Sequence, residues 1–439
     1  MRQAGHAPAA VQAEVADGRR RGLTAAGLRI APRLQRVARK RLPGLRNLLC
    51  CVPRGRGPAA YASAFNWGGH MRRFIAAASA AGIGFAFTAT YAVAASASVI
   101  QASVIRASVI VVSPGHSIQA AVDHAHPGDT ILLKAGVFHQ SVQIRTDRIT
   151  LRGSGDSRSG TVLEPPARLP RTICNRVFGG SGVCVLAKKL NLKNGAVRKR
   201  VYGDTVTDLR VANFPASGVF GYGTYGLTVT NVAAVRDGAY GISRFESTRT
   251  LFADDIAVGN HEAGFYVGDS PDAAAVVRDN RASGNQLGVF IRHARGVRVI
   301  GNRVTKNCQG ILVLDDGQRG GVGNAVIKRN GVFGNSKFCP KTAESPRLKG
   351  GGILLLGATE TRVADNSVAG NTGRELNSGG IVILSARQLT HGSNPRHDSI
   401  VNNTAYRNRP ADIRWDGTGS GLHFARNHCR TSAPAGLCH

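Results

Sequence analysis

The apolar residues of this chain follow a repeating pattern from about residue 205 onward. Each unit holds an Asn or Asp, a second Asn five residues later, and then a Gly-apolar-x-apolar run, as in GNRVTKNCQGILVLDD. The second asparagines are Asn260, Asn285, Asn307, Asn335, Asn371 and Asn408, with steps of 25, 22, 28, 36 and 37 residues. A unit this short cannot bury its own apolar face, so it must stack on copies of itself. The runs of Val, Ile and Leu favour parallel strands, and the pattern predicts a parallel solenoid.

A leucine-rich repeat is the alternative solenoid, but its Leu-x-x-Leu-x-Leu frame is absent and no unit has room for a helix. Asn at a fixed position suits a left-handed turn, and stacked side-chain amides bond along the axis. We therefore assign the asparagines to structure. The predicted interior columns are formed by Ile311, Val313, Ile353, Leu355, Ile381 and Ile383. The longer steps indicate insertions, Lys337 to Lys349 and Ala386 to Asp398, that leave the coil on one edge, where long loops tend to carry function.

The first hundred residues carry a different pattern. Residues 1–70 are rich in Arg, Ala, Gly and Pro, and residues 71–97 combine Met71-Arg72-Arg73, an apolar run and small-residue A-x-A sites. The second segment is typical of a secretory signal peptide. We expect translation to start at Met71, with residues 1–70 as translated upstream DNA. A basic nucleic-acid-binding arm is the alternative, but an arm ahead of the signal would block export. We expect a secreted protein, extracellular or associated with the cell wall, without a membrane span after cleavage.

Residues 98–112 contain the five-residue repeat ASVIQASVIR and indicate a linker and first strand, followed by a repeat domain at residues 113–439. The stretch SIQAAVDHAHPGDTILLKAGVF predicts a short helix capped by Ser117, a Pro-Gly-Asp turn and an apolar strand. This opening and the later coils resemble the secreted right-handed parallel β-helix proteins of the pectate-lyase-like superfamily, with carbohydrate-binding and sugar-hydrolase repeats. The resemblance covers nearly all of residues 111–439. It implies an all-β fold, a right-handed parallel β-helix with a short N-terminal capping helix.

The resemblance leaves the activity open, because the superfamily includes lyases, glycosidases, epimerases, non-catalytic adhesins and accessory proteins for copper-enzyme maturation. The net charge narrows the class of partner molecule that we expect. Of 57 Lys/Arg and 26 Asp/Glu, the segment before Ala95 holds 15 and 2, which leaves 42 and 24, a net charge of +18. A basic exported protein favours an anionic partner, an acidic polysaccharide or cell-wall glycan. We expect no nucleic-acid partner for the mature chain, and a monomer. The alternative is that the positive charge only keeps an exported protein soluble.

The cysteines agree with export. Six lie after the signal peptide, as three neighbouring couples, which predicts local disulfides in an oxidising compartment. We predict the pairs Cys174–Cys184, Cys308–Cys339 and Cys429–Cys438. No C-x-x-C occurs, so the sequence does not indicate a zinc knuckle.

Titratable residues recur at one position of the repeat. Five residues after the Gly that opens each strand stand Glu246, Asp269, His293 and Asp315. Neighbouring coils lie about 4.8 Å apart, so we expect a ladder of four titratable groups at one edge of a sheet, flanked by Arg244, Arg292 and Asp316. Carboxylates this close raise one another's pKa, and an adjacent cation lowers it. The alternative is that these are turn residues without further role.

Three functions fit this ladder. In a polyuronate lyase, Ca²⁺ held by Asp269, Asp315 or Asp316 would neutralise the substrate carboxylate, with Arg292 or His293 as the base. Calcium is the one cofactor that we consider. The net charge suits such an anionic substrate.

An inverting glycoside hydrolase is the second possibility, because Asp269 and Asp315, two coils apart, would be separated by about 9–10 Å, the upper end of the inverting range. The Asn-Thr-Asp, Gly-His-Gly and Arg-Ile-Lys signatures of polygalacturonases are absent, however. A non-catalytic carbohydrate-binding or wall-associated β-helix is the third, and it needs no catalytic site.

Overall fold

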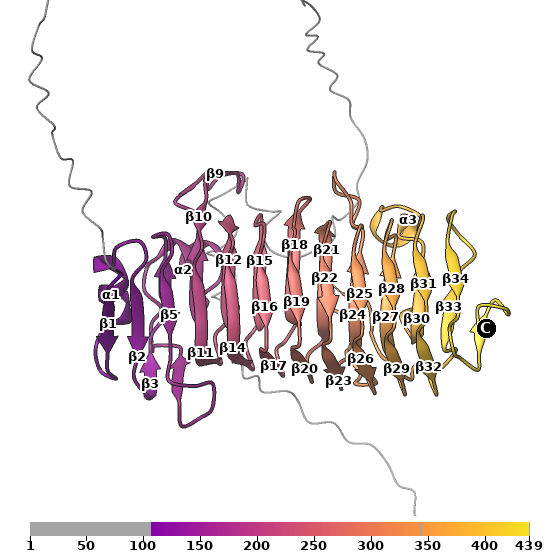
Figure 1. Cartoon of the computed structure of the whole chain (residues 1–439), viewed down its shortest axis with the longest axis horizontal. Helices are drawn as coiled ribbons and strands as arrows, with labels where there is room; N and C mark the ends of the chain where they lie inside the picture. The colour runs from indigo at the N-terminus through magenta and orange to yellow at the C-terminus, as the bar shows by residue number, and fades with distance from the viewer. Residues whose placement is uncertain (1–106, 343–344, 439) are drawn as a thin grey trace, which may run out of the picture. The chain divides into compact units, whose positions relative to one another are not determined.

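The computed structural model describes residues 107–342 and 345–438, which form a parallel β-helix with its coils stacked in chain order (Figure 1). The expectations for residues 1–70 and for the signal peptide at residues 71–97 lie outside the described residues, as does most of the linker. Among the described helices, none is long and apolar enough to cross a membrane.

One face of the coil is an eleven-stranded sheet in which each strand pairs in parallel with the strand of the next coil. Its strands are β4 (Val142–Ile144), β7 (Val183–Leu186), β12 (Val219–Tyr222), β15 (Ile242–Phe245), β18 (Ala263–Ser270), β21 (Leu287–Ala294), β24 (Gln309–Leu314), β27 (Gly351–Leu356), β30 (Gly379–Leu384), β33 (Ile413–Trp415) and β35 (Ser432–Ala433).

The remaining coil strands form a twenty-stranded sheet that bends at a corner within each coil. Before the corner lie β1 (Val109–Val112), β2 (Thr130–Leu133), β5 (Thr150–Arg152), β16 (Leu251–Ala253), β19 (Val276–Arg278), β22 (Arg298–Ile300), β25 (Val326–Lys328), β28 (Arg362–Ala364), β31 (Ser399–Val401) and β34 (His423–Ala425). After it lie β3 (Gly136–His139), β6 (Thr161–Glu164), β17 (Ile256–Val258), β20 (Arg281–Ser283), β23 (Arg303–Thr305), β26 (Gly331–Phe333), β29 (Ser367–Ala369) and β32 (Thr404–Tyr406). The long strands β11 (Thr205–Ala212) and β14 (Thr228–Val235) run through the corner.

The other elements are short. They are the antiparallel pair β8 (Lys189–Leu190) and β9 (Val197–Lys199), the parallel pair β10 (Val201–Tyr202) and β13 (Thr224–Tyr225), and the helices α1 (Ile118–His124), α2 (Ile173–Val177) and α3 (Arg387–Thr390). As predicted, α1 is capped by Ser117, whose side chain accepts a hydrogen bond from the Ala120 N–H at 3.0 Å.

The interior is filled by apolar columns that run along the axis. Ile311 pairs in register with Ile353 and then Ile381, and Val313, Leu355 and Ile383 form the neighbouring column. All six side chains are fully buried. The predicted core is therefore confirmed, and so is the all-β fold class.

Two ladders of side-chain amides follow the turns. One runs through Asp237, Asn260, Asn285, Asn307, Asn335, Asn371, Asn408 and Asp412, and the other through Asp255, Asn280, Asn302, Asn330, Asn366, Asn403 and Asn427. Each Asn accepts a hydrogen bond from the backbone N–H of its counterpart in the preceding coil. Each amide also donates to the next ladder oxygen at 2.8–3.1 Å. The stacking predicted for the asparagine side chains is confirmed, with a second ladder five residues earlier in each unit. The left-handed turn expected at the asparagines lies one residue earlier, because the residue before each ladder Asn has the positive φ and the Asn itself does not.

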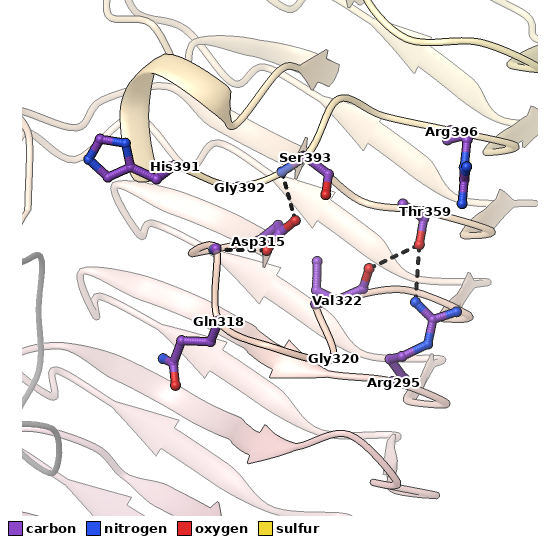
Figure 2. Close-up of a pocket in the computed structure, with 12 residues that line it drawn as sticks. Arg295, Asp315, Gln318, Gly320, Val322, Thr359, His391, Gly392, Ser393 and Arg396 are labelled. Carbon is purple, nitrogen blue, oxygen red and sulfur yellow. Dashed lines mark hydrogen bonds between the residues drawn. The ribbon is translucent and has the colours of Figure 1, made fainter. Parts of the chain in front are cut away.

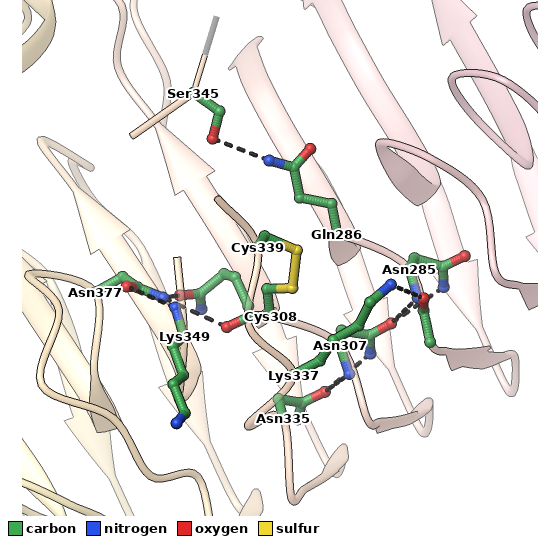
Figure 3. Close-up of a disulfide and its surroundings, with 12 residues drawn as sticks. Asn285, Gln286, Asn307, Cys308, Asn335, Lys337, Cys339, Ser345, Lys349 and Asn377 are labelled. Carbon is green, nitrogen blue, oxygen red and sulfur yellow. Dashed lines mark hydrogen bonds between the residues drawn. A yellow bond between two sulfur atoms is a disulfide. The ribbon is translucent and has the colours of Figure 1, made fainter. Parts of the chain in front are cut away.

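Three disulfides join Cys174 to Cys184, Cys308 to Cys339 and Cys429 to Cys438, the pairs predicted from the sequence. The Cys308–Cys339 bridge lies beside the amide ladder and ties down the loop that follows Lys337 (Figure 3). One expectation about the insertions is wrong. The 337–349 insertion precedes β27, whereas the 386–398 insertion follows β30, so the two loops lie at opposite ends of the strands of the eleven-stranded sheet.

Candidate functional site

The four titratable residues expected to form a ladder occupy successive coils. Glu246, Asp269, His293 and Asp315 each follow directly on strand positions that pair in register. The first three have left-handed backbones, with φ of 49°, 48° and 48°. These three residues are therefore bend residues and members of a column at the same time. Asp315 lacks the left-handed backbone, so its place in the column comes from the strand register alone.

Asp269 and His293 belong to an ion-pair network with two of the expected flanking residues. The Arg292 guanidinium lies 2.6 Å from the Asp316 carboxylate and 3.8 Å from that of Asp269. The His293 Nδ1 lies 3.6 Å from the Asp269 Oδ1, and its Nε2 lies 2.6 Å from the backbone oxygen of Arg319. The side chains of this network are mostly buried, under the 315–322 loop that follows β24.

The charges of this network favour its ionised form. Asp269 and the Arg319 carbonyl favour the charged imidazolium, which raises the pKa of His293 above its usual value although burial opposes the shift. Burial also lowers the pKa of Arg292, but Tyr266, Asp316 and Asp269 more than offset it, so the net shift is upward. Arg292 therefore offers no lone pair for proton abstraction. The Nε2 of His293 is occupied by the Arg319 carbonyl, and its Nδ1 is buried without a hydrogen-bond partner among the described residues.

Asp315 has different partners. Its carboxylate accepts hydrogen bonds from the backbone N–H of Gly317 at 3.0 Å and of Ser393 at 2.8 Å, and Thr390 bonds its carbonyl oxygen at 2.5 Å. Asp315 thus anchors the 386–398 insertion to the neighbouring coils. Within residues 107–342 and 345–438, no three His, Cys, Asp or Glu side chains are placed to hold a metal ion. Asp269, Asp315 and Asp316 are accordingly not gathered into one calcium site.

Arg244 does not flank the ladder, contrary to expectation. It pairs in register with Val267 and points into the coil, where its side chain is fully buried. Its guanidinium donates to the carbonyls of Ser247 at 2.6 Å and Ala273 at 2.8 Å and to the Ser270 hydroxyl. Burial lowers the pKa of Arg244 to about 9. Its hydrogen bonds tie two turns together from the inside.

Glu246 is the ladder member with the fewest partners. Among the residues that the structure describes, no hydrogen bond or ion pair holds its half-buried carboxyl group. Burial and the nearby Asp269 charge raise the pKa of Glu246 above its usual value. Arg200, from the segment between β9 and β10, donates to the Glu246 carbonyl at 2.5 Å, and its charge opposes the upward shift.

A pocket of about 370 Å³ opens beside the network, between the 315–322 loop and the 386–398 insertion (Figure 2). Its lining includes Arg295, Arg396 and His391, together with Asp315 and Gln318. The backbone of Arg295 is linked to that of Arg396 through bridges at Gly323 and Thr359, one coil at a time. The two arginines are thus three coils, or about 14 Å, apart along the axis.

The two arginines differ in how many partners their side chains have. Arg295 donates to the Thr359 hydroxyl at 3.1 Å and pairs with Glu360. Arg396 is exposed and has no side-chain hydrogen bond or ion pair within the described part of the chain. Sequence reasoning assigned a role to neither, because the coils between them carry Gly323 and Thr359 at the same position, so no run of similar residues marks it. The predicted insertion at residues 386–398 was the available signal for Arg396.

Known proteins show the same architecture. Residues 217–395 match the family described as "Right handed beta helix region". This β-helix is right-handed. The predicted fold, a right-handed parallel β-helix, is confirmed.

Solved structures with similar folds include several carbohydrate-active proteins. The A-module of mannuronan C-5 epimerase AlgE4 from Azotobacter vinelandii is 16% identical, with 73% of this chain and 96% of that chain covered and a TM-score of 0.45. An alginate lyase from Paenibacillus sp. is 16% identical, with 75% and 96% covered and a TM-score of 0.43. DFA-IIIase from Arthrobacter chlorophenolicus A6 is 14% identical, with 71% and 80% covered and a TM-score of 0.47. No curated protein sequence matches the chain. At this level of similarity the neighbours assign no activity.

Proposed function

We propose that the protein binds an acidic polysaccharide outside the cell, with the pocket beside Asp315 as the binding site. One observation carries the proposal: Arg396 is exposed at the pocket without an ion-pair partner among the described residues, in line with Arg295 three coils away. A ligand that contacts both arginines must extend along the axis, as an oligosaccharide does. Its acidic groups would pair with the guanidinium of Arg396.

The local charge supports an anionic ligand. The Asp315 carboxylate at the pocket already accepts two backbone hydrogen bonds, so its negative charge is partly compensated, whereas that of Arg396 is not. The net charge of +18 from Ala95 onward, from 42 basic and 24 acidic residues, attracts polyanions generally. The three disulfides suit an oxidising compartment, in agreement with the expected signal peptide.

Binding is favoured over lyase chemistry at the ladder. Of the expected bases, Arg292 is ion-paired with Asp316, and His293 is buried with its Nε2 occupied by the Arg319 carbonyl. The pair expected for inverting hydrolysis is engaged too, because Asp269 faces His293 and Asp315 bonds to Ser393. Calcium would need a rearrangement of these carboxylates. The protein would then be a carbohydrate-binding β-helix.

Catalysis at Glu246 is the second candidate function. Its carboxyl group is half-buried, has a raised pKa and lacks a partner in the described part of the chain. These are the properties of a general acid. Asp269, in register one coil further, is the nearest second carboxyl group.

The pocket is tested by the change Arg396→Gln, with Arg387→Gln as the matched control. Both arginines are exposed and belong to the same insertion, but Arg387 does not line the pocket. Calorimetry with hexagalacturonate should show about fivefold weaker binding for Arg396→Gln and no change for Arg387→Gln, since one exposed ion pair contributes about 1 kcal/mol at most. Equal affinities for the two variants, or equal affinity for a neutral maltohexaose, would contradict the proposal.

Catalysis is tested separately. Absorbance of the unsaturated lyase product, followed with and without calcium, and reducing-end release report lyase and hydrolase activity on polyuronates. If either activity is found, Glu246→Gln should abolish it and leave hexagalacturonate binding intact. Activity that survives Glu246→Gln would exclude Glu246 as the acid.

A further inference from the structure

A second basic surface lies on the twenty-stranded sheet, away from the pocket. Arg281 at the start of β20 and Arg303 at the start of β23 are direct register partners in neighbouring coils. Both are exposed, and so is Lys306, which follows β23 in the same coil. Arg298, at the start of β22, adds a fourth exposed cation on the other side of the corner. We call these four residues the arginine stripe.

The stripe carries uncompensated charge. Like charges directly opposite each other on adjacent strands destabilise a sheet. Within the described residues, no carboxylate forms an ion pair with Arg281, Arg303, Arg298 or Lys306. Two neighbouring cations on the same sheet, Arg278 and Lys328, do have carboxylate partners.

Both of these cations lie close to carboxylates. Arg278 lies 2.8 Å from Asp279 and 3.8 Å from Asp254, and Lys328 lies 3.2 Å from Asp365. Acidic residues are thus available along the corner but are used elsewhere. An external anion would relieve the repulsion between Arg281 and Arg303.

The surroundings favour an extended, hydroxyl-rich ligand. Ser283 and Thr305 are register partners two residues after the arginines, and the Thr305 hydroxyl donates to that of Ser283 at 3.4 Å. Hydroxyl groups beside cations suit the mixed carboxylate and hydroxyl groups of a uronate chain. Sites for single-stranded nucleic acid present aromatic platforms for base stacking. Here the ring of Phe333 is covered by the Arg303 guanidinium, whose Cζ lies 5.6 Å from the ring centroid.

We propose that the arginine stripe is a second binding surface for a linear acidic polysaccharide, independent of the pocket. Arg281 and Arg303 lie about 4.8 Å apart along the axis, and Arg298 and Lys306 belong to the same coil as Arg303, so the four cations form a patch two coils wide on the twenty-stranded sheet. A segment of polymer that crosses this patch meets several cations at once. The stripe does not depend on the function proposed for the pocket.

The test compares two double variants that remove the same charge. Arg281→Ser/Arg303→Ser removes the unpaired cations, and the same column carries Ser367 two coils further on, so the position accepts serine. The control is Arg278→Ser/Lys328→Ser, which removes two cations that already have carboxylate partners. Circular dichroism and melting curves establish that both variants are folded.

Binding is measured by affinity electrophoresis in polygalacturonate and in alginate, over a series of salt concentrations. The stripe variant should bind the polymers at least about fivefold more weakly than the control. In a plot of the logarithm of affinity against the logarithm of salt concentration, the slope for the stripe variant should also be less steep by about two, by analogy with charge neutralisation on nucleic acids. Hexagalacturonate binding at the pocket should be unchanged, which separates failure of the stripe from failure of the pocket.

Three results would overturn the proposal. The first is equal polymer affinity and salt dependence in the two double variants. The second is the absence of polyuronate binding by the parent protein. The third is tighter binding of single-stranded DNA than of either polyuronate, with the loss in the stripe variant confined to DNA.

Discussion

The ladder that runs from Asp237 to Asp412 begins with an acid, whereas the coils that follow carry an asparagine at the same position. Asp237 is therefore a sensitive test of the architecture. Its Oδ1 accepts the Phe214 N–H at 3.0 Å, while its Oδ2 is buried without a partner. Its own N–H donates to the Asn260 Oδ1 at 3.0 Å. In the coils that follow, the side-chain atom equivalent to Oδ2 is an amide nitrogen that donates to that same kind of oxygen. Asp237→Asn should therefore complete the ladder.

The pH dependence follows from the pKa. Burial raises the pKa of Asp237 well above the usual 3.8, so folding favours the protonated form. The contribution to stability is fully present below pH 3.8, and it is lost progressively as the pH rises toward the folded-state pKa. The magnitude follows from the unpaired Oδ2, because a buried polar atom without a partner costs about 1–3 kcal/mol. We expect Asp237→Asn to raise the unfolding free energy by about 1–3 kcal/mol at neutral pH and by little near pH 4.

The assay is urea unfolding with intact disulfides, followed by circular dichroism from about pH 4 to about pH 8. The parent protein should lose stability over this range more steeply than Asp237→Asn. The reciprocal change Asn285→Asp is the control, because the Asn285 amide now donates to the Asn307 Oδ1 at 3.1 Å and the Ala257 carbonyl at 3.0 Å. It should destabilise the protein, increasingly so with rising pH. Parallel stability curves for parent and Asp237→Asn would refute the reasoning.

Three further changes probe other parts of the fold. Ile353→Asp buries an unpaired charge between Ile311 and Ile381 and should melt several coils, which a lowered melting temperature and lost circular dichroism would report. Asp315→Asn removes one of two acceptors for backbone N–H groups. It should lower the free energy of unfolding by about 1–3 kcal/mol and speed hydrogen exchange at Ser393. Unchanged exchange would count against the anchoring role. Serine at both Cys308 and Cys339 should speed exchange in the 337–342 segment alone, and a global loss of protection would contradict the local role of this bridge.

The repeat could be predicted because it obeys one rule in every coil. Apolar residues at alternate positions placed Ile311 and Val313 in the interior, and the Asn spacing gave the ladder. The same parity could have placed Arg244, since it aligns with Val267 in the register. A charged residue at an interior position breaks the expected pattern. Its burial is made feasible by the carbonyls of Ser247 and Ala273 and by the Ser270 hydroxyl, which accept hydrogen bonds from its guanidinium.

The candidate site was predictable only in part. Counting from the strand glycine placed Glu246, Asp269, His293 and Asp315 in one column, because register fixes backbone positions. It could not give the partners of the side chains, which depend on loops. The Asp315 carboxylate bonds to Ser393, 78 residues away, and no local pattern encodes that contact. The hydrogen bond between His293 and the Arg319 carbonyl depends likewise on the conformation of the 315–322 loop.

The amide ladder also gives the solenoid an electrical direction. Every ladder carbonyl from Asn260 to Asn408 accepts from the coil before it, so these oxygens all face the N-terminal end. The aligned amides form a row of dipoles with its positive end toward the C-terminal coils, as in an α-helix of opposite sense. Asp412 takes the positive end, where its carboxylate accepts from Asn408 and Thr431, much as an acid caps the N-terminus of a helix. Asp237 lies at the negative end, where an ionised carboxylate is opposed by the row itself. The two acids that bound the ladder are therefore not equivalent, and the solenoid has a polarity that its repeated coils alone would not suggest.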